Sequence, residues 1–354
     1  MRFLKIKIKR EYILSIIAVI LGLIAGALLM IVTGNNPFSG FSYLFRGGLM
    51  SIERIGNTIA ASTPLIFSGL SVAFAFRTGL FNIGSAGQML MGGVTASAIA
   101  LNLNLPKVLL LPVMFIGALV AGGLWGSISG FLKAKFNVHE VVSTIMLNWI
   151  AYWSVYYIVP LYMKAEFLET ESRRIPAAGS LRVEWLKDLF NGSYINLGIF
   201  LAIIVSVIIA FILDKTTLGY ELKAVGFNKT AAETAGIDVN RNIILSMAIS
   251  GALAGIGGLT LYTGIASNIQ IGILPSQGFD GIAVSLLGAN SPLGVFVSAL
   301  FFGLLHSGKG FMTAVTGIPP EIADTIIATI IYFAATSVVI DRILENRKRR
   351  REEN

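Results

Sequence analysis

The side chains that could do chemistry lie in two glycine-rich, apolar segments, residues 79–93 and 275–290. Polar groups at membrane depth are costly unless they face protein or water, so their presence in such segments needs a reason. Paired glycine-interrupted segments in opposite halves of a chain indicate an internal repeat around a central pathway. We therefore predict that a path for a polar solute is lined by Asn82, Ser85, Gln88, Asp280 and Ser285.

The alternative is that these polar side chains interact only with neighbouring groups of the fold and line no pathway. Asp280 could stabilise the N-terminus of a short helix through the helix dipole, and Asn82 could cap a helix. The apolar part of 275–290 is only about ten residues long, roughly 15 Å of helix. Such a segment is too short to cross a bilayer alone.

Enzyme chemistry has no candidate group in this sequence. Cysteine is absent, which excludes disulfides, cysteine-ligated zinc and thiol nucleophiles. We expect His139 to form a polar pair with Glu140 at the membrane boundary and His306 to stand alone, which leaves too little for a metal cluster. No G-x-x-x-x-G-K-[ST], H-E-x-x-H or G-x-S-x-G motif occurs. The chain is expected to be no enzyme and to hold no metal, cofactor or ATP of its own.

The elements that position these residues must be membrane-spanning helices. Hydrophobic residues make up 55% of the 354 and charged residues 13%, against about a quarter charged in soluble proteins. A helix crosses a bilayer with about 20 apolar residues. We predict an all-α polytopic membrane protein of about ten transmembrane helices, two of them interrupted or half-spanning, at 12–33, 55–76, 84–102, 107–133, 140–163, 196–213, 242–264, 275–290, 293–308 and 322–340.

The net charge of +8 is concentrated at the chain ends, residues 1–11 and 342–354. Short basic flanks mark the cytoplasmic side of a membrane and attract anionic lipid headgroups, so nucleic acid is not an expected partner. Both termini are then cytoplasmic, on either side of a transmembrane domain at 12–341. By parity the polar stretch 164–195 is extracellular and the stretch 214–241 is cytoplasmic.

Small residues recur at four-residue spacing in two expected helices. Gly122, Gly126 and Gly130 form two successive G-x-x-x-G steps, and Gly251 and Gly255 form another. This spacing lets helix backbones approach closely in lipid. It predicts tight packing but says nothing about a substrate.

The cytoplasmic stretch 214–241 predicts a short exposed helix at residues 229–235, with Asn228 as its N-cap and Gly236 at its end. A short helix with a small apolar face, held between two spans, suits a groove on another protein. The alternative is a tight turn that lies on the membrane.

Four stretches stand in a specific order: F-N-I-G-S-A-G-Q-M-L-M-G-G at 81–93, H-E-V-V-S-T-I-M-L-N-W-I-A at 139–151, Ala231-Ala232 followed by Gly236 and Ile237, and G-F-D-G-I-A-V-S-L-L-G at 278–288. In these stretches the chain resembles ABC-transporter permeases of the ribose and branched-chain amino-acid type, most closely the bacterial nucleoside-uptake branch. The resemblance covers about 55–340. It implies an ATPase coupling loop at Ala231, Ala232, Glu233, Gly236 and Ile237, although Glu233-Thr234 departs from the residues usual there.

This resemblance implies the permease subunit of an importer in a bacterial plasma membrane. Two ATPase subunits would hold the ATP, a second permease, homologous or identical, would complete the pore, and a substrate-binding lipoprotein would deliver a nucleoside. It adds Asn148 and Trp149 to the candidate pathway residues. Aromatic stacking suits a nucleobase, so Trp149 and Tyr152 are candidate platforms.

Three alternatives stay open. The same machine could carry a simple sugar, because its pathway would be similarly polar. An ion-coupled secondary transporter would need ionisable groups in the membrane, for which Asp280 and Asp324 are the main candidates. A membrane scaffold without transport activity would need none of these side chains.

Overall fold

The computed structural model describes residues 2–336, which are mostly helical and, over this range, contain only isolated bridges and no strand. Seven helices are long and apolar enough to cross a membrane. The prediction of an all-α polytopic membrane protein is confirmed. The seven are α1 (Arg2–Val32), α3 (Ile52–Arg77), α5 (Lys107–Phe136), α6 (Glu140–Ile158) with the π-helix η1 (Val159–Met163), α8 (Gly198–Lys215), α11 (Val239–Leu259) with the π-helix η3 (Thr260–Ala266), and α13 (Pro292–Thr316).

The other three expected crossings are shorter helices, α4 (Ser85–Asn102), α12 (Ser276–Leu287) and α14 (Pro320–Ala335). The 12 residues of α12 give about 18 Å of helix, against about 30 Å for the hydrocarbon core of a bilayer. It is therefore half-spanning. The end of the expected span 322–340 and the basic segment 342–354 lie outside the described residues.

Two helix boundaries differ from the prediction. α1 already begins at Arg2, so residues 2–11 of the basic segment are helical and continuous with the first span. α13 runs past the expected end at 308 to Thr316. The charge of Lys309 does not end this helix, because its Nζ lies 2.8 Å from Oδ1 of Asp324 on α14. The helix ends instead at Gly317, which has a φ of +70°.

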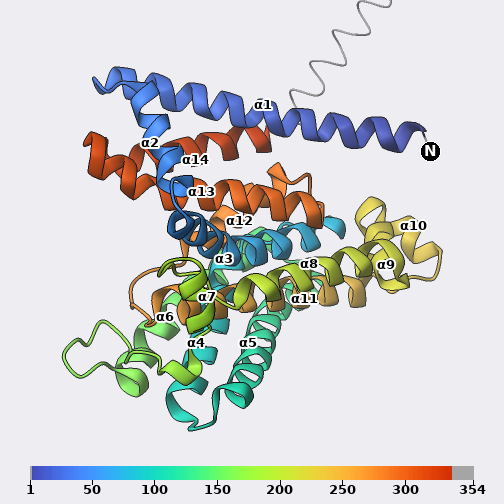
Figure 1. The fold of residues 1–354 in the computed structure, drawn as a ribbon. Coiled ribbons are helices and arrows are strands. Elements are labelled where there is room, and N and C mark those ends of the chain that lie inside the picture. Colours follow the sequence, from blue (N-terminus) through green and yellow to red (C-terminus); the bar gives the residue numbers. More distant parts are fainter. Residues whose placement is uncertain (1, 337–354) are drawn as a thin grey trace, which may run out of the picture.

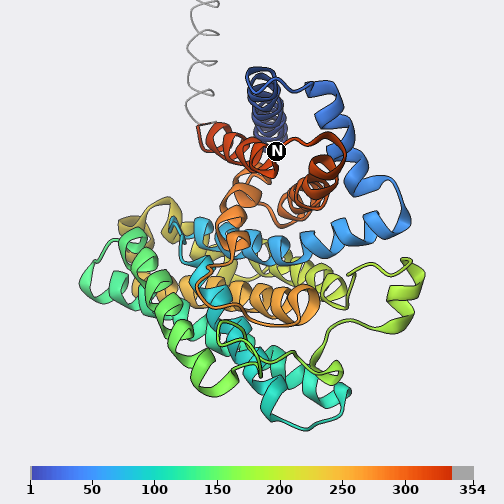
Figure 2. The ribbon, with the colours of Figure 1, turned by 90° about the vertical axis from the view of Figure 1, so that its left-hand side faces the viewer.

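Helix α3 lies at the centre of the molecule (Figures 1 and 2). Its apolar stretch is 83% buried, against 22% for those of α1 and α5. Helices α8, α11, α12 and α13 all pack on it, and Phe67, Phe74 and Phe302 are fully buried in the same core. The loop that leads from α3 into α4 is consequently enclosed by several helices.

The helix bundle has two distinct ends (Figure 1). One end holds the start of α1 together with α9 (Thr217–Phe227) and α10 (Lys229–Thr234). The opposite end holds α2 (Pro37–Leu49) and the irregular segment 164–195, which contains η2 (Ala177–Gly179) and α7 (Glu184–Leu189). The N-terminus and residues 214–241 thus lie on one side of the bundle, and residues 164–195 lie on the other.

Helices α5 and α11 are in backbone contact along their glycines, as the four-residue spacing predicts. A Cβ atom added to Gly122 would lie 2.7 Å from Gly255 Cα, and one added to Gly126 would lie 2.9 Å from Gly251 Cα. Real Cβ atoms are not found at such distances from a backbone. The absence of side chains is therefore what permits this close approach.

Candidate translocation pathway and coupling helix

Asn82 and Gln88 lie at the centre of a buried hydrogen-bond network between α3, α4 and α11. Asn82 Nδ2 donates to Gln88 Oε1 at 2.8 Å and to Ser250 Oγ at 2.7 Å, and Gln88 Nε2 donates to Asn82 Oδ1 at 3.2 Å. Ser250 Oγ donates to the Ser71 carbonyl at 2.7 Å. Asn82 Oδ1 also accepts from Gly84 N–H at 2.9 Å, which fixes the turn before α4. The four side chains are at most 1% exposed.

Asn148 ties α6 to the start of α4. Its Oδ1 accepts from Gly87 N–H at 2.8 Å, and its Nδ2 donates to the Ile83 carbonyl at 3.0 Å. The predicted pathway amides Asn82, Gln88 and Asn148 are thus gathered around one helix start. In this conformation they satisfy one another and nearby backbone groups, and so they join four helices instead of facing an open path.

The remaining predicted residues are placed differently. Ser85 is fully buried, and its hydroxyl has no hydrogen-bond partner within residues 2–336. Trp149 is 51% exposed. Ser285 Oγ donates to Asn290 Oδ1 at 2.7 Å at the tip of the α12–α13 hairpin.

The two interrupted segments touch each other through small residues. A Cβ atom added to Gly278 of α12 would lie 2.5 Å from the backbone nitrogen of Ala86 in α4. One added to Gly281 would lie 2.6 Å from Ser68 Oγ in α3. α12 therefore lies against the start of α4, beside the amide network.

Asp280 has a partner that was not expected. Its Oδ2 lies 3.2 Å from His306 Nε2, and the two side chains are 14% and 18% exposed. The expectation that His306 stands alone is wrong, because α12 and α13 form a hairpin that places residues 26 positions apart in sequence side by side. Neither atom makes a well-aligned hydrogen bond to a described residue.

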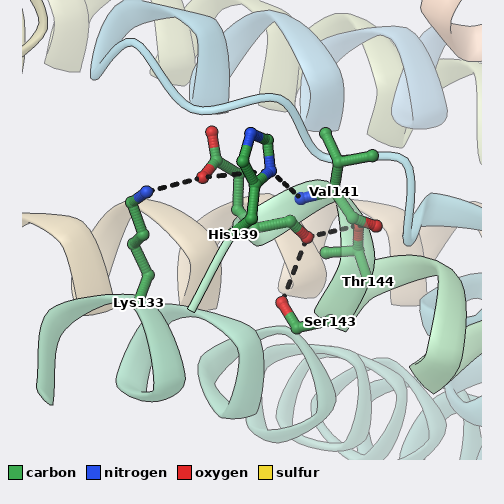
Figure 3. Close-up of polar contacts among 6 residues, drawn as sticks. Lys133, His139, Val141, Ser143 and Thr144 are labelled. Atoms are coloured by element: carbon green, nitrogen blue, oxygen red, sulfur yellow. Dashed lines mark hydrogen bonds and ion pairs between the residues drawn. The ribbon is translucent and has the colours of Figure 1, made fainter. Parts of the chain in front are cut away.

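A salt bridge fixes the corner between α5 and α6 (Figure 3). Lys133 Nζ lies 3.0 Å from Glu140 Oε2, and both side chains are largely buried. His139 Nδ1 lies 3.9 Å from the same oxygen, so the predicted pair of His139 with Glu140 exists, but Lys133 is the closer partner. His139 Nδ1 also accepts from Val141 N–H at 3.3 Å and caps α6. Asn137, at φ +52°, makes the turn between the helices.

Helix α10 forms where the stretch 214–241 predicts a short helix. Asn228 Oδ1 accepts from Ala231 N–H at 3.1 Å, as expected of an N-cap. At the other end Ile237 N–H donates to the Ala232 carbonyl at 3.0 Å and Gly236 N–H donates to the Glu233 carbonyl at 2.9 Å. This pair of hydrogen bonds forms a Schellman motif. The motif requires a residue with positive φ after the helix, and Gly236 has a φ of +84°.

The coupling-loop residues divide into one anchor and an exposed surface. Ala232 is 4% exposed and packs with Leu80 and Val225 in one apolar cluster, against which Ile237 also packs. Ala231, Glu233 and Gly236 are exposed. Leu80 is two residues before Asn82, so the anchor of α10 adjoins the loop that carries the amide network.

Helix α6 exposes a row of aromatic residues on one face: Trp149, Tyr152, Trp153 and Tyr156. Successive members lie one helical turn or less apart, with ring centroids 5.5 Å apart for Trp149 and Tyr152 and 5.1 Å for Tyr152 and Trp153. Trp153 is 60% exposed and Tyr156 is 46% exposed. The buried face of α6 that adjoins this row carries Asn148 and packs on α4.

A polytopic helical bundle with a buried polar centre and a short exposed helix at one end is the architecture of a transport permease. Residues 54–335 match the family described as branched-chain amino acid transport system / permease component, and the chain belongs to this family. The expectations of an ABC-type permease and of a transport component in place of an enzyme are confirmed by this membership. It also implies ATPase and binding-protein partners.

Similar proteins cover almost the whole chain. The guanosine ABC transporter permease protein NupP of Bacillus subtilis is 43% identical over 96% of this chain and 97% of its own length. The nucleoside ABC transporter permease protein NupB of Lactococcus lactis is 40% identical over 96% and 94%. The glucose ABC transporter permease protein TsgB13 of Haloferax volcanii is 30% identical over 92% and 88%.

Proposed function

We propose that this chain is the permease subunit of an ABC importer that carries nucleosides across a bacterial plasma membrane. We choose nucleosides as the cargo because the chain is similar, over nearly its full length, to two permeases named for guanosine and for nucleosides, at 43% and 40% identity. The permease named for glucose is less similar, at 30%. A simple sugar remains the second candidate cargo for the same machine.

In this proposal ATP is bound by two partner subunits, and the chain itself carries no cofactor. The exposed face of α10 enters a groove on the ATPase, as short amphipathic helices do. Movement of α10 is transmitted through Ala232 and Leu80 to the loop that carries Asn82. Both termini and α10 are then cytoplasmic, and residues 164–195 face a substrate-binding lipoprotein outside.

A second permease subunit, homologous or identical, completes the pore. The aromatic row on α6 supports this part of the proposal. Four large aromatic residues on one face form a broad surface that could contact a second permease subunit or stack on a nucleobase. Trp149 and Tyr152 belong to that row, so they serve as pathway residues only if α6 faces the pore. The amides of the buried network would then lie one helix behind the pore wall.

The test is to purify the tagged protein from its native membrane in gentle detergent and to identify co-purifying chains by mass spectrometry. We expect an ATPase with a P-loop and a lipoprotein to co-purify. If the pore is a heterodimer, a homologous permease should co-purify as well; if it is a homodimer, this chain should be the permease that is found. The purified complex in proteoliposomes should take up radiolabelled guanosine when ATP is supplied.

Two results would contradict the proposal in different ways. Uptake of glucose with no uptake of any nucleoside would mean that the transported solute is a sugar, while the assignment to an ABC importer would stand. Uptake driven by a proton gradient without an ATPase would favour the ion-coupled alternative, with Asp280 as the first residue to substitute. Family membership argues against that second result.

A further inference from the structure

A cavity of about 440 Å³ lies where η3, residues 267–275 and the start of α12 meet. It is on the side of the bundle that holds residues 164–195, because Ile271 N–H donates to the Thr170 carbonyl and Ser172 N–H to the Ile269 carbonyl, both at 2.9 Å. Its volume falls within the range of about 300–1,000 Å³ that is usual for small-molecule sites. The sequence prediction did not include any of its residues.

Tyr262 is the buried polar residue of this cavity. Its side chain is 7% exposed, and its hydroxyl has no hydrogen-bond partner within the described part of the chain. The ring packs on α4, where a side chain on Gly93 would collide with it. The hydroxyl is not fully enclosed by protein, and Tyr262 lines the cavity, so this unpaired hydroxyl is suited to a ligand that forms a hydrogen bond with it.

Two amides on the cavity wall are oriented by one carboxylate. Asn268 Nδ2 donates to Glu171 Oε2 at 2.7 Å, and Gln270 Nε2 donates to Glu171 Oε1 at 3.0 Å. Their carbonyl oxygens therefore point away from Glu171 and are free to accept. Gln277, at the start of α12, adds an amide that makes no hydrogen bond to any described residue.

The irregular helix that carries Tyr262 is held in place from the outside. Arg182 Nε donates to the Gly264 carbonyl at 2.7 Å, its Nη2 donates to the Ile265 carbonyl, and its guanidinium lies over the ring of Tyr194. Burial lowers the pKa of Arg182 from its ordinary value, but a guanidinium remains charged at neutral pH. π-Helical turns inside longer helices occur often at functional sites.

The rest of the wall is apolar apart from Ser276, and none of the described residues that line the cavity is charged; the apolar part is formed by Leu261, Ala266, Ile273, Leu274 and Pro275. A neutral solute with flat apolar faces and an edge of N–H donors matches this combination better than a sugar, whose hydroxyls point in every direction. The cavity lies close to the aromatic row of α6, since the Tyr152 hydroxyl is 3.7 Å from where a Cβ of Gly272 would stand.

We propose that this cavity is a transit site for a nucleoside, with the Tyr262 hydroxyl and the amides of Asn268, Gln270 and Gln277 on its polar edge. This inference rests on the proposed cargo and adds to it the place where the cargo stops. The base lies against the apolar wall, and the amide oxygens accept from its N–H groups.

The absence of cysteine makes a direct test practical. Gln277→Cys places the only thiol of this chain in the cavity, and Thr33→Cys places one at an exposed position on the same side, outside the cavity. Each variant complex is placed in proteoliposomes without its binding protein, so that a docked protein cannot shield the thiol. A membrane-impermeant thiol reagent is then added with guanosine, with glucose or with neither.

Guanosine is expected to slow modification of Gln277→Cys and to leave Thr33→Cys unchanged, while glucose protects neither. Adding Tyr262→Phe to the Gln277→Cys variant should raise the guanosine concentration for half-protection about five- to tenfold, the effect of one lost hydrogen bond.

No protection of Gln277→Cys, in a complex whose wild type imports guanosine, would overturn the site and leave the proposed function standing. Unchanged half-protection after Tyr262→Phe would remove Tyr262 from it. A wild-type complex that imports no nucleoside would overturn the proposed function, and the inference with it.

Discussion

Gly226, near the end of α9, lies directly on Gly79, at the end of α3. A Cβ atom added to Gly79 would stand 3.3 Å from the Gly226 carbonyl oxygen, and one added to Gly226 would stand 3.0 Å from Gly79 N and in contact with the Arg77 carbonyl. This contact joins the helix pair α9–α10 to the central helix of the bundle. A motion of α10 therefore reaches α3 through backbone contact without relying on flexible side chains.

The first prediction concerns this contact. Gly226→Ala forces α9 away from the backbone of α3, and such overpacking costs about 1–3 kcal/mol. We expect ATP hydrolysis to continue while uptake per ATP falls, measured together in proteoliposomes. Gly310→Ala is the matched control, because an added Cβ there has no atom within 4 Å. Equal uptake per ATP in the two variants would show that coupling does not pass through Gly226.

The second prediction concerns the end of the coupling helix. Gly236 has a φ of +84° with no atom within 4 Å of an added Cβ, so a substitution there acts on conformation and on the partner-facing surface. Gly236→Leu should cost about 1–2 kcal/mol of local conformational energy and uncouple hydrolysis from uptake while the protein stays in the membrane. Gly236→Asn should retain more coupling, because asparagine tolerates positive φ. Normal transport by Gly236→Leu would refute docking at this surface.

The third prediction compares neighbouring glycines in α5. Gly122→Ala would push its Cβ to 2.7 Å from Gly255 Cα, whereas Gly123→Ala meets its nearest atom, the Ala248 carbonyl oxygen, at 3.4 Å. The melting temperature in detergent should fall for Gly122→Ala by an amount that corresponds to about 1–3 kcal/mol. Gly123→Ala should be neutral or stabilise by up to about 1 kcal/mol through helix propensity. The same melting temperature for both would mean that α5 and α11 are not in contact here.

The fourth prediction concerns the amide network. Asn82→Ala removes the partner of Gln88 and of Ser250, and each buried group left unpaired costs about 1–3 kcal/mol. The same change at Asn102, an exposed residue whose amide donates to the Ala98 carbonyl of its own helix, should shift stability by about 0.5 kcal/mol or less. Thermal unfolding of both variants checks this. If Asn82→Ala lost uptake at unchanged stability, Asn82 would instead be a pathway residue.

The fifth prediction concerns Asp280 and His306. His306→Leu leaves the Asp280 carboxylate without the imidazole that lies 3.2 Å from it, and a buried polar group left without its partner costs about 1–3 kcal/mol. The double variant Asp280→Leu with His306→Leu should recover much of that loss, since no unpaired charge remains. A double-mutant cycle on melting temperature tests this, and strictly additive losses would mean that the two residues do not interact.

Hydropathy was sufficient to predict the seven helices that are long enough to span a membrane, because a helix needs about 20 apolar residues to cross a bilayer. It did not distinguish them from the shorter helices α4, α12 and α14. The short coupling helix was predictable from Asn228 and Gly236, whose cap and φ are local properties. Close approach of α5 and α11 also followed from glycine spacing. The end of α13 could not be predicted from the sequence, because the pairing of Lys309 with Asp324 depends on a contact between two helices.

The polar residues of the candidate site were found, but their arrangement was not predictable. Asn82 and Gln88 stood out as amides in an apolar segment, whereas Ser250 is a common residue in a membrane helix and gave no signal. Whether an amide faces a path or another amide is decided by packing among helices distant in sequence. Tyr262 was missed for the same reason, since nothing local marks a hydroxyl that packing leaves without a partner.

The half-spanning α12 also constrains how the protein is made. A 12-residue helix that carries Asp280 gains too little from lipid to enter a membrane by itself. His306, whose Nε2 lies 3.2 Å from Oδ2 of Asp280, is on α13, which is synthesised later. Arg77 of the earlier α3 donates to the Asn290 carbonyl at 2.9 Å at the tip of the hairpin. We therefore expect α12 to enter the membrane only together with α13, as a hairpin that packs on α3. Insertion of α12 is then expected to be a late step in the biogenesis of this permease, because it follows the synthesis of α13.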